Sequence, residues 1–142
     1  MKGDTVQIVW IDQTNCCLLD NIATGVFDES IRQDRLRHYL SNPHNWMVLA
    51  IVDGLVVAQC MCVVHQHPDK ETELYLDEIG TGDNWRRQGI ATALMHAVFA
   101  RADDMGIEEI WLGTEADNVP AQRLYEKTGA TGELALIYYL EW

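Results

Sequence analysis

An Asp-Gly pair between two apolar runs is the feature that most constrains how this chain can fold. Residues 46–52 and 55–64 are rich in β-branched and apolar side chains, and Asp53 and Gly54 join them. Both central positions of a two-residue hairpin turn need positive φ, which Asp and Gly accept readily. The sequence therefore predicts an antiparallel hairpin in the middle of the chain.

The remaining elements follow from hydrophobic periodicity and from turn residues. We expect further strands at 6–11, 73–80, 109–113 and 134–140, and helices at 16–26, 30–40, 88–105 and 119–128. This order, β-α-α-β-β-β-α-β-α-β, predicts a mixed α/β fold with a mostly antiparallel central sheet flanked by helices. At 142 residues, the chain is predicted to be a single domain spanning 1–142.

The charge balance restricts the partners. The chain has 22 acidic and 10 basic residues, a formal net charge of −12. Nucleic acids and anionic membranes would be repelled, so neither is expected as a partner. A cationic small-molecule substrate is favoured, although acidity that only maintains solubility is the open alternative.

No apolar run is long enough to span a bilayer, and the first residues lack the apolar stretch of a secretory signal. We therefore expect a cytoplasmic protein.

The four cysteines (Cys16, Cys17, Cys60 and Cys62) do not have the spacing of a zinc site and are expected to be small buried hydrophobes. His65 and His67 lie in a polar loop without a further ligand motif nearby, so solvated histidines are expected and no metal site is predicted.

Residues 83–94 carry the strongest functional signal. Arg86 and Arg87 stand between a predicted strand and the start of the longest predicted helix, where free N–H groups and the helix dipole favour an anion. The small residues Gly89 and Ala91 would let the backbone approach a phosphate closely. Neither a P-loop nor a dinucleotide-binding turn is present, because there is no Gly-Lys-Ser/Thr and Trp85 replaces the required third glycine. The segment predicts a diphosphate cradle, against the alternative of a solvated arginine pair.

This stretch resembles a known family. The pattern Arg-x-x-Gly-x-Ala at 86–91 is similar to the Arg/Gln-x-x-Gly-x-Gly/Ala signature of the GNAT superfamily of N-acetyltransferases. The pattern Asn-x-x-Ala-x-x-Leu-Tyr-x-Lys-x-Gly at 118–129 resembles a later helix of the same superfamily, and the order of elements fits over nearly the whole chain. The resemblance implies the GNAT fold and acetyl-CoA as cosubstrate, without a metal.

The resemblance also implies which residues bind the cosubstrate. The pyrophosphate of coenzyme A would be held by the loop and helix start, namely Arg86, Arg87, Gln88, Gly89, Ile90, Ala91 and Thr92. The preceding strand would bind the pantetheine arm through the backbone of Ile79, Gly80 and Thr81. Asn118 would contact the cosubstrate, cap its own helix, or do both.

Acetyl transfer to an amine needs a group that accepts the amine's proton. Glu78 occupies a position where many GNAT enzymes carry an acidic residue, so the resemblance makes it the candidate base, acting directly or through water. A surface ion pair is the alternative role. Tyr125 matches the tyrosine that protonates the leaving thiolate in many members, with a core tyrosine as the alternative. Transfer is expected to be direct, without a cysteine intermediate.

The sequence constrains the identity of the substrate less than it constrains the fold or the cosubstrate. The segment 73–94 looks like aminoglycoside 3-N-acetyltransferases of the GNAT type, and a polycationic substrate suits the net charge. Candidate substrate-binding carboxylates are Asp28, Glu29, Asp34, Asp77, Glu78, Glu115 and Asp117, each of which could instead be a solvated surface charge. Another amine (a polyamine, an amino acid or a protein N-terminus) and a non-catalytic acyl-CoA-binding module stay open. So does the oligomeric state, a homodimer included.

Overall fold

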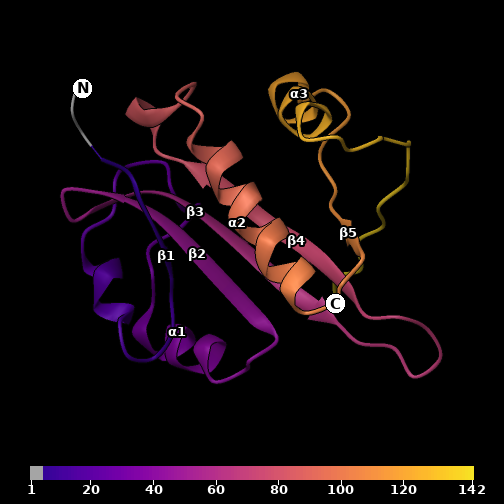
Figure 1. The fold of residues 1–142 in the computed structure, drawn as a ribbon, viewed down its shortest axis with the longest axis horizontal. Helices are drawn as coiled ribbons and strands as arrows, with labels where there is room; N and C mark the ends of the chain where they lie inside the picture. Colours follow the sequence, from indigo (N-terminus) through magenta and orange to yellow (C-terminus); the bar gives the residue numbers. More distant parts are fainter. Residues whose placement is uncertain (1–4) are drawn as a thin grey trace. The chain divides into compact units, whose positions relative to one another are not determined.

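The computed structural model describes residues 5–142 (Figure 1). The strands are β1 (Gln7–Trp10), β2 (Asn45–Val52), β3 (Leu55–His65), β4 (Glu73–Thr81) and β5 (Glu109–Trp111). The α-helices are α1 (Gln33–Leu40), α2 (Ile90–Asp104) and α3 (Val119–Lys127), and two 3-10 turns are η1 (Cys16–Asp20) and η2 (Asp83–Trp85). The chain divides after Leu112 into two compact units, and each is described by itself.

The first unit is built on one five-stranded sheet with the order β1-β2-β3-β4-β5. The first three pairings are antiparallel and β4 pairs with β5 in parallel, so the predicted mixed, mostly antiparallel sheet is confirmed. The predicted hairpin is confirmed as well: Asp53 and Gly54 have φ of 49° and 78°, and β2 and β3 pair directly beside them.

The two faces of the sheet bury different elements. Met47, Leu49 and Ile51 of β2 belong to an apolar cluster that includes Leu36 of α1. The residues between them in β2 are also buried, and strand alternation points them to the opposite face. Helix α2 contacts β2, β3 and β4 and runs along these strands (Figure 1), so it covers that second face.

An arginine fastens the last turns of α2 to the sheet. The Arg101 guanidinium carbon lies 4.4 Å from the ring centroid of Trp10 and 4.5 Å from that of Trp46. The two indole rings meet edge to face, with centroids 5.8 Å apart. Such partly desolvated cation–π contacts contribute about 0.5–2 kcal/mol, which helps to hold α2 in place.

The helix predicted at 16–26 is wrong beyond its first turn. Only η1 forms, and the residues after it bond to β3 instead: Val56 donates its N–H to the Asn21 carbonyl and Ala23 donates to the Val56 carbonyl, both at 2.9 Å. These bonds replace an intrahelical ladder, and Gly25, with φ of 90°, departs from helical geometry. Asn15 makes no side-chain capping bond; its amide instead accepts from the N–H of Asp12.

The strand predicted at 134–140 is also wrong. Residues 130–142 form neither helix nor strand, and their large apolar side chains are exposed, Leu134 to 92%. The segment has strong β-propensity, but propensity describes the fit to a half-buried sheet surface, and these side chains bury little.

The cysteines divide into two kinds, all four being free thiols. Cys60 and Cys62 are buried, as predicted, whereas Cys16 is half-buried and Cys17 is exposed. The hydrogen bond with Cys62 and burial both raise the pKa of the Cys60 thiol, which leaves it protonated and unsuited to act as a nucleophile.

Across residues 5–142, none of the helices combines the length and apolar character that a bilayer span requires.

Candidate active site

A bulge in β4 sets the position of Glu78. Met61 of β3 pairs with Glu78, but the next β3 residue, Cys62, pairs with Leu76, so Asp77 is an extra residue in β4. Directly paired residues share a face, which places Glu78 on the side of Met61, a residue packed against the α1-side cluster. Asp77 itself is exposed. Bulges of this kind commonly lie beside active sites, where they redirect a side chain.

The carboxylate of Glu78 is held by a buried amide. Gln59 Nε2 donates to Glu78 Oε1 at 3.0 Å and to the Val26 carbonyl at 3.2 Å. Gln59 is fully buried, and its Oε1 has no hydrogen-bond partner within the described part of the chain. An orphaned buried acceptor is uncommon and marks a place where a water or a ligand donor would bind. Gln59 was not among the predicted site residues, although it is the one polar side chain within the apolar run 55–64.

Burial raises the pKa of the Glu78 carboxyl, and the nearby carboxylates of Asp28 and Asp77 raise it further. The hydrogen bond from Gln59 opposes these effects. The net direction is upward, so Glu78 is a stronger base than a fully solvated glutamate. A carboxylate with this character can accept a proton from an amine.

The segment that follows η1 brings Asp28 toward Glu78. Asp83 donates its N–H to the Thr24 carbonyl at 3.0 Å, which ties the segment to the end of β4. At Gly80, a Cβ atom would lie 2.3 Å from the Val26 carbonyl oxygen, so only glycine allows this close approach. Gly80 was predicted to bind the cosubstrate through its backbone, which stays a prediction. The structure shows a separate reason for glycine at this position, the close approach of Val26.

An open pocket of about 620 Å³ lies along the same segment. Three of its lining residues are acidic: Asp20, Asp28 and Glu29. Two of these were predicted to bind substrate, and Asp20 was missed because the turn that ends at it was expected to be helix. The pocket lining does not include Glu78, which is linked to it through the charge of Asp28. Asp34 lies outside the pocket and forms a surface ion pair with Arg32 at 2.8 Å.

The loop after β4 has the geometry of an anion site. Helix α2 begins at Ile90, two residues later than predicted, and its first bond runs from Ala93 N to the Gly89 carbonyl at 3.1 Å. The N–H groups of the three residues before Ala93 therefore precede the helical ladder and can bind an anion. Gly89 has φ of 79° with open space around its Cα, so the left-handed conformation, more than a lack of room, requires glycine there.

The two arginines of this loop are exposed. Arg86 donates from Nη2 to Asp83 Oδ1 at 3.2 Å and from Nε to the Thr81 carbonyl at 3.4 Å. It thereby braces the loop as well as supplying charge. Arg87 has a positive φ of 63°, and Gln88 Nε2 lies 3.5 Å from the Asn84 carbonyl.

One edge of β4 is open near Glu78. Strand β5 pairs only with residues 73–75, so beyond Tyr75 the β5 side of β4 has no strand partner within the described part of the first unit, residues 5–112. Ile79, Gly80 and Thr81 pair with β3 on the other side. Unpaired N–H and C=O groups along a strand edge can bind an extended polar chain, which is the shape of a pantetheine arm.

Residues 113–142 carry the other predicted site residues. The Asn118 side chain accepts from Ala121 N at 3.2 Å, so its role as the cap of α3 is confirmed, and its contact with the cosubstrate stays a prediction. Tyr125 lies half-buried in α3, while Glu115 and Asp117 are exposed. Their roles in catalysis and substrate binding stay predictions.

Comparison with known proteins decides the family. Residues 11–130 match the acetyltransferase (GNAT) family. The chain belongs to this family. It is 36% identical over 111 residues to an uncharacterized N-acetyltransferase of Mycobacterium tuberculosis, covering 78% of this chain and 67% of that protein. It is 30% identical over 101 residues to human N-alpha-acetyltransferase 30, covering 68% of this chain and 28% of that protein.

Solved structures confirm the fold of this GNAT protein. An aminoglycoside acetyltransferase from a soil metagenomic sample, in complex with sisomicin, has a TM-score of 0.81 at 18% identity, covering 96% of this chain and 97% of that one. The aminoglycoside N-acetyltransferase AAC(6')-Iy in complex with CoA has a TM-score of 0.78 at 18% identity, with coverage of 99% and 97%. A ribosomal-protein-alanine N-acetyltransferase from Brucella melitensis has a TM-score of 0.73 at 19% identity, with coverage of 97% and 100%. These likenesses concern the fold, and they do not support the predicted 3-N position in particular.

Proposed function

We propose that this GNAT N-acetyltransferase transfers the acetyl group of acetyl-CoA to an amine of a cationic small molecule, with aminoglycosides as the first class to test. The observation that carries the proposal is Glu78, a carboxyl with a raised pKa beside the acidic pocket that Asp28 helps to line. A raised carboxyl pKa suits a base, and surrounding carboxylates attract an ammonium substrate.

The proposed chemistry is direct transfer. Acetyl-CoA supplies the thioester carbon that the amine attacks. Glu78 accepts a proton from the amine, directly or through one water, because an ammonium group has no lone pair for attack. Tyr125 is proposed to donate a proton to the departing thiolate; this role rests on the family pattern around it.

The cosubstrate would be held by two features that suit its chemistry. The open edge of β4 at Ile79, Gly80 and Thr81 offers backbone groups to the pantetheine amides. The start of α2 and the loop before it offer N–H groups and positive charge to the pyrophosphate. The residues proposed for the second role are Arg86, Arg87, Gln88, Gly89, Ile90, Ala91 and Thr92. Asn118 is proposed to contact the cosubstrate as well.

The acidic surroundings support a polycationic substrate. Asp28 and Glu29 line the pocket and Asp77 lies beside Glu78, so the substrate would meet several carboxylates before it reaches the base. Glu115 and Asp117 are proposed as further substrate contacts from the family pattern.

The position of acetylation on an aminoglycoside has to be measured. The sequence resemblance favours the 3-N amine, whereas the name of the similar enzyme AAC(6')-Iy contains 6'.

The test is mass detection of acetylated product with acetyl-CoA and a panel of amines. The panel contains aminoglycosides, polyamines, amino acids and peptides with free N-termini. An aminoglycoside product that depends on Glu78 would support the proposal, and nuclear magnetic resonance of that product would give the position of the acetyl group. Acetyl-CoA binding with product only from other amines would overturn the substrate class. Binding without any turnover would indicate an acyl-CoA-binding module.

A protein N-terminus is the second candidate substrate. The observation in its favour is the similarity to human N-alpha-acetyltransferase 30 and, in fold, to a ribosomal-protein-alanine N-acetyltransferase. A peptide α-amine also needs a base such as Glu78 but does not need the acidic pocket. Peptides in the panel separate the two candidates directly.

A further inference from the structure

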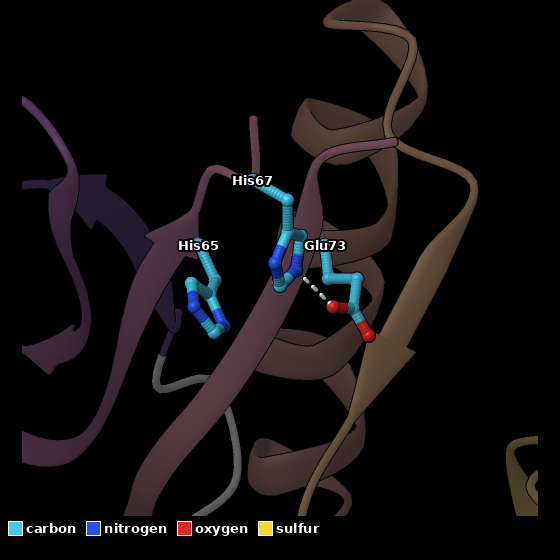
Figure 2. A group of neighbouring side chains, drawn as sticks. All are labelled: His65, His67 and Glu73. Atoms are coloured by element: carbon cyan, nitrogen blue, oxygen red, sulfur yellow. Dashed lines mark hydrogen bonds and ion pairs between the residues drawn. The ribbon is translucent and has the colours of Figure 1, made fainter. Parts of the chain in front are cut away.

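Three side chains converge at the end of β4 opposite to the candidate active site (Figure 2). His65 is the last residue of β3, Glu73 is the first residue of β4, and the two are cross-strand partners. His67 lies in the connecting loop, and its Nε2 contacts Glu73 Oε2. The rings of His65 and His67 have centroids 4.1 Å apart. One potential ligand atom from each residue lies within 4.8 Å of those of the other two.

The three residues differ in their exposure to solvent. The side chains of His67 and Glu73 are only 12% and 20% exposed, whereas His65 is an exposed residue. Two ligands are therefore largely withdrawn from water and held by their mutual contact. The third lies at the surface, where it can rotate and where an ion can enter.

We propose that His65, His67 and Glu73 form a binding site for a divalent transition-metal ion of the Zn²⁺ class. Two imidazoles and one carboxylate are donors that Zn²⁺ uses, whereas Mg²⁺ and Ca²⁺ prefer oxygen ligands alone. A water would take the fourth position of a tetrahedral site. Tetrahedral Zn²⁺ with bonds of about 2.0–2.1 Å keeps its ligand atoms about 3.3 Å apart. A rotation of the exposed His65 ring would supply the contraction needed.

An ion pair between His67 and Glu73 explains only two of the three residues. That pair does not require His65, yet the ring of His65 lies next to the ring of His67 (Figure 2). The hairpin register accounts for the convergence, since it places Glu73 opposite His65 while the loop returns His67 between them. Solvated histidines were expected from the sequence because only this cross-strand pairing brings Glu73 beside them, whereas His67 is in fact largely buried.

The site is separate from acetyl transfer. Glu73 precedes Glu78 by five residues in β4, a distance of about 16 Å along a strand. A bound ion would join the ends of β3 and β4 and would stabilise the folded chain by an amount that grows with the logarithm of the free ion concentration once this exceeds the Kd. The proposal is therefore independent of the substrate and of the catalytic roles given above.

The test measures binding of Zn²⁺ alone to the full, reduced chain by isothermal titration calorimetry. We expect one ion per chain, with an affinity at least about tenfold weaker in each of His65→Asn, His67→Gln and Glu73→Gln. His96→Asn is the matched control, because His96 is exposed on α2 outside the cluster, and it should bind Zn²⁺ like the parent chain. Addition of Zn²⁺ should also raise the Tm of the parent chain and should raise that of His65→Asn much less.

Cobalt identifies the ligands. Co²⁺ bound by imidazole and carboxylate should give visible absorption without the intense thiolate charge-transfer band that cysteine ligands would produce. That band would overturn the proposal and indicate a site at the cysteines. The proposal also fails if the parent chain does not bind Zn²⁺, or if all three variants bind it as the parent does. If Glu73→Gln or His67→Gln misfolds, the exposed His65→Asn still decides the question.

Discussion

Strand β4 carries a glutamate toward each end, and the two carboxylates meet different surroundings. Glu78 accepts a hydrogen bond from the buried Gln59 and lies near Asp28 and Asp77, so its pKa is raised. Glu73 contacts His67 and faces His65, which are potential cationic or metal-binding partners. The same residue type on the same strand therefore suits a proposed base at one end and a proposed metal ligand at the other. Neighbouring charges and burial, more than residue type, set the chemistry.

The largest expected effect is on the candidate base. Glu78→Gln should lower kcat about 10²- to 10⁴-fold, since the amide cannot accept the amine's proton. The affinity for acetyl-CoA should stay within about twofold, because the cosubstrate is proposed to bind the loop and the β4 backbone. Steady-state kinetics and calorimetry measure the two quantities. Glu108→Gln, at an exposed position before β5, is the control that should keep full activity. A Glu78→Gln enzyme with unchanged kcat would remove the distinction between the two glutamates.

The loop beyond the Glu78 end can be tested through its glycine. Gly89→Ala places a Cβ in the left-handed region at a cost of about 1–2 kcal/mol, and relief of that strain should distort the anion site. We expect the Kd for acetyl-CoA to rise about tenfold, measured by calorimetry. Gly106→Ala is the matched control, since Gly106 has φ of 73° and equally open surroundings at the opposite end of α2. Equal losses of stability and of affinity in both variants would argue against a cosubstrate role for the Gly89 loop.

Replacement of Glu73 and of Glu78 by glutamine should change the free energy of unfolding in opposite directions. Glu73→Gln, unfolded by urea with a chelator present, should lose about 1–2 kcal/mol at pH 7 because the contact with His67 is weakened. Because the pKa of Glu78 is raised in the folded chain, the protonated carboxyl favours folding relative to the ionised one. This stabilisation is fully present below about pH 4.5 and is lost as the pH rises through the folded-state pKa of Glu78. Glu78→Gln should therefore gain stability at pH 7, by roughly 0.5 kcal/mol given partial solvent screening, and none at pH 4. Equal losses in both variants at pH 7 would contradict the comparison.

The smallest effect concerns Asp28. Asp28→Asn removes a negative charge near Glu78, so the Glu78 pKa should fall and the acidic limb of the kcat/KM profile should move to lower pH. The value of kcat/KM for a polycationic substrate should fall about two- to fivefold at neutral pH. Asp34→Asn, whose parent carboxylate forms a surface ion pair with Arg32, should change neither quantity. A pH profile that is the same in Asp28→Asn and the parent enzyme would separate Asp28 from the base.

Much of the sheet could be predicted from the sequence, and the cosubstrate role of the loop after β4 stays a prediction. The Asp53-Gly54 turn indicates its hairpin because the required backbone angles are local properties of the two residues. The loop at 86–89 is recognisable because its glycine and arginines act through local backbone geometry and the helix start. Gln59 and Glu73 were missed as candidate site residues, since the partner of each lies on another strand.

Two segments show the limit of sequence patterns most clearly. Residues 16–26 have helical spacing, yet after η1 Asn21 and Ala23 form backbone hydrogen bonds with Val56 of β3, and Gly25 departs from helical geometry. Residues 134–140 have strand propensity but remain irregular and exposed. In both segments the outcome depends on whether a neighbouring strand offers backbone partners, which a local pattern does not contain.

The amino-acid sequence alone specified the family, the central hairpin and the acidic character of the protein, and it predicted an anion site in the loop after β4. These features depend on residues that are close together in the chain or on net composition. The tertiary structure decided the surroundings of the carboxylates: the bulge at Asp77, the amide of Gln59 beside Glu78, and the histidines beside Glu73. Hydrogen bonds, burial and charge–charge interactions act over a few ångströms in space, and folding alone determines which distant residues come that close.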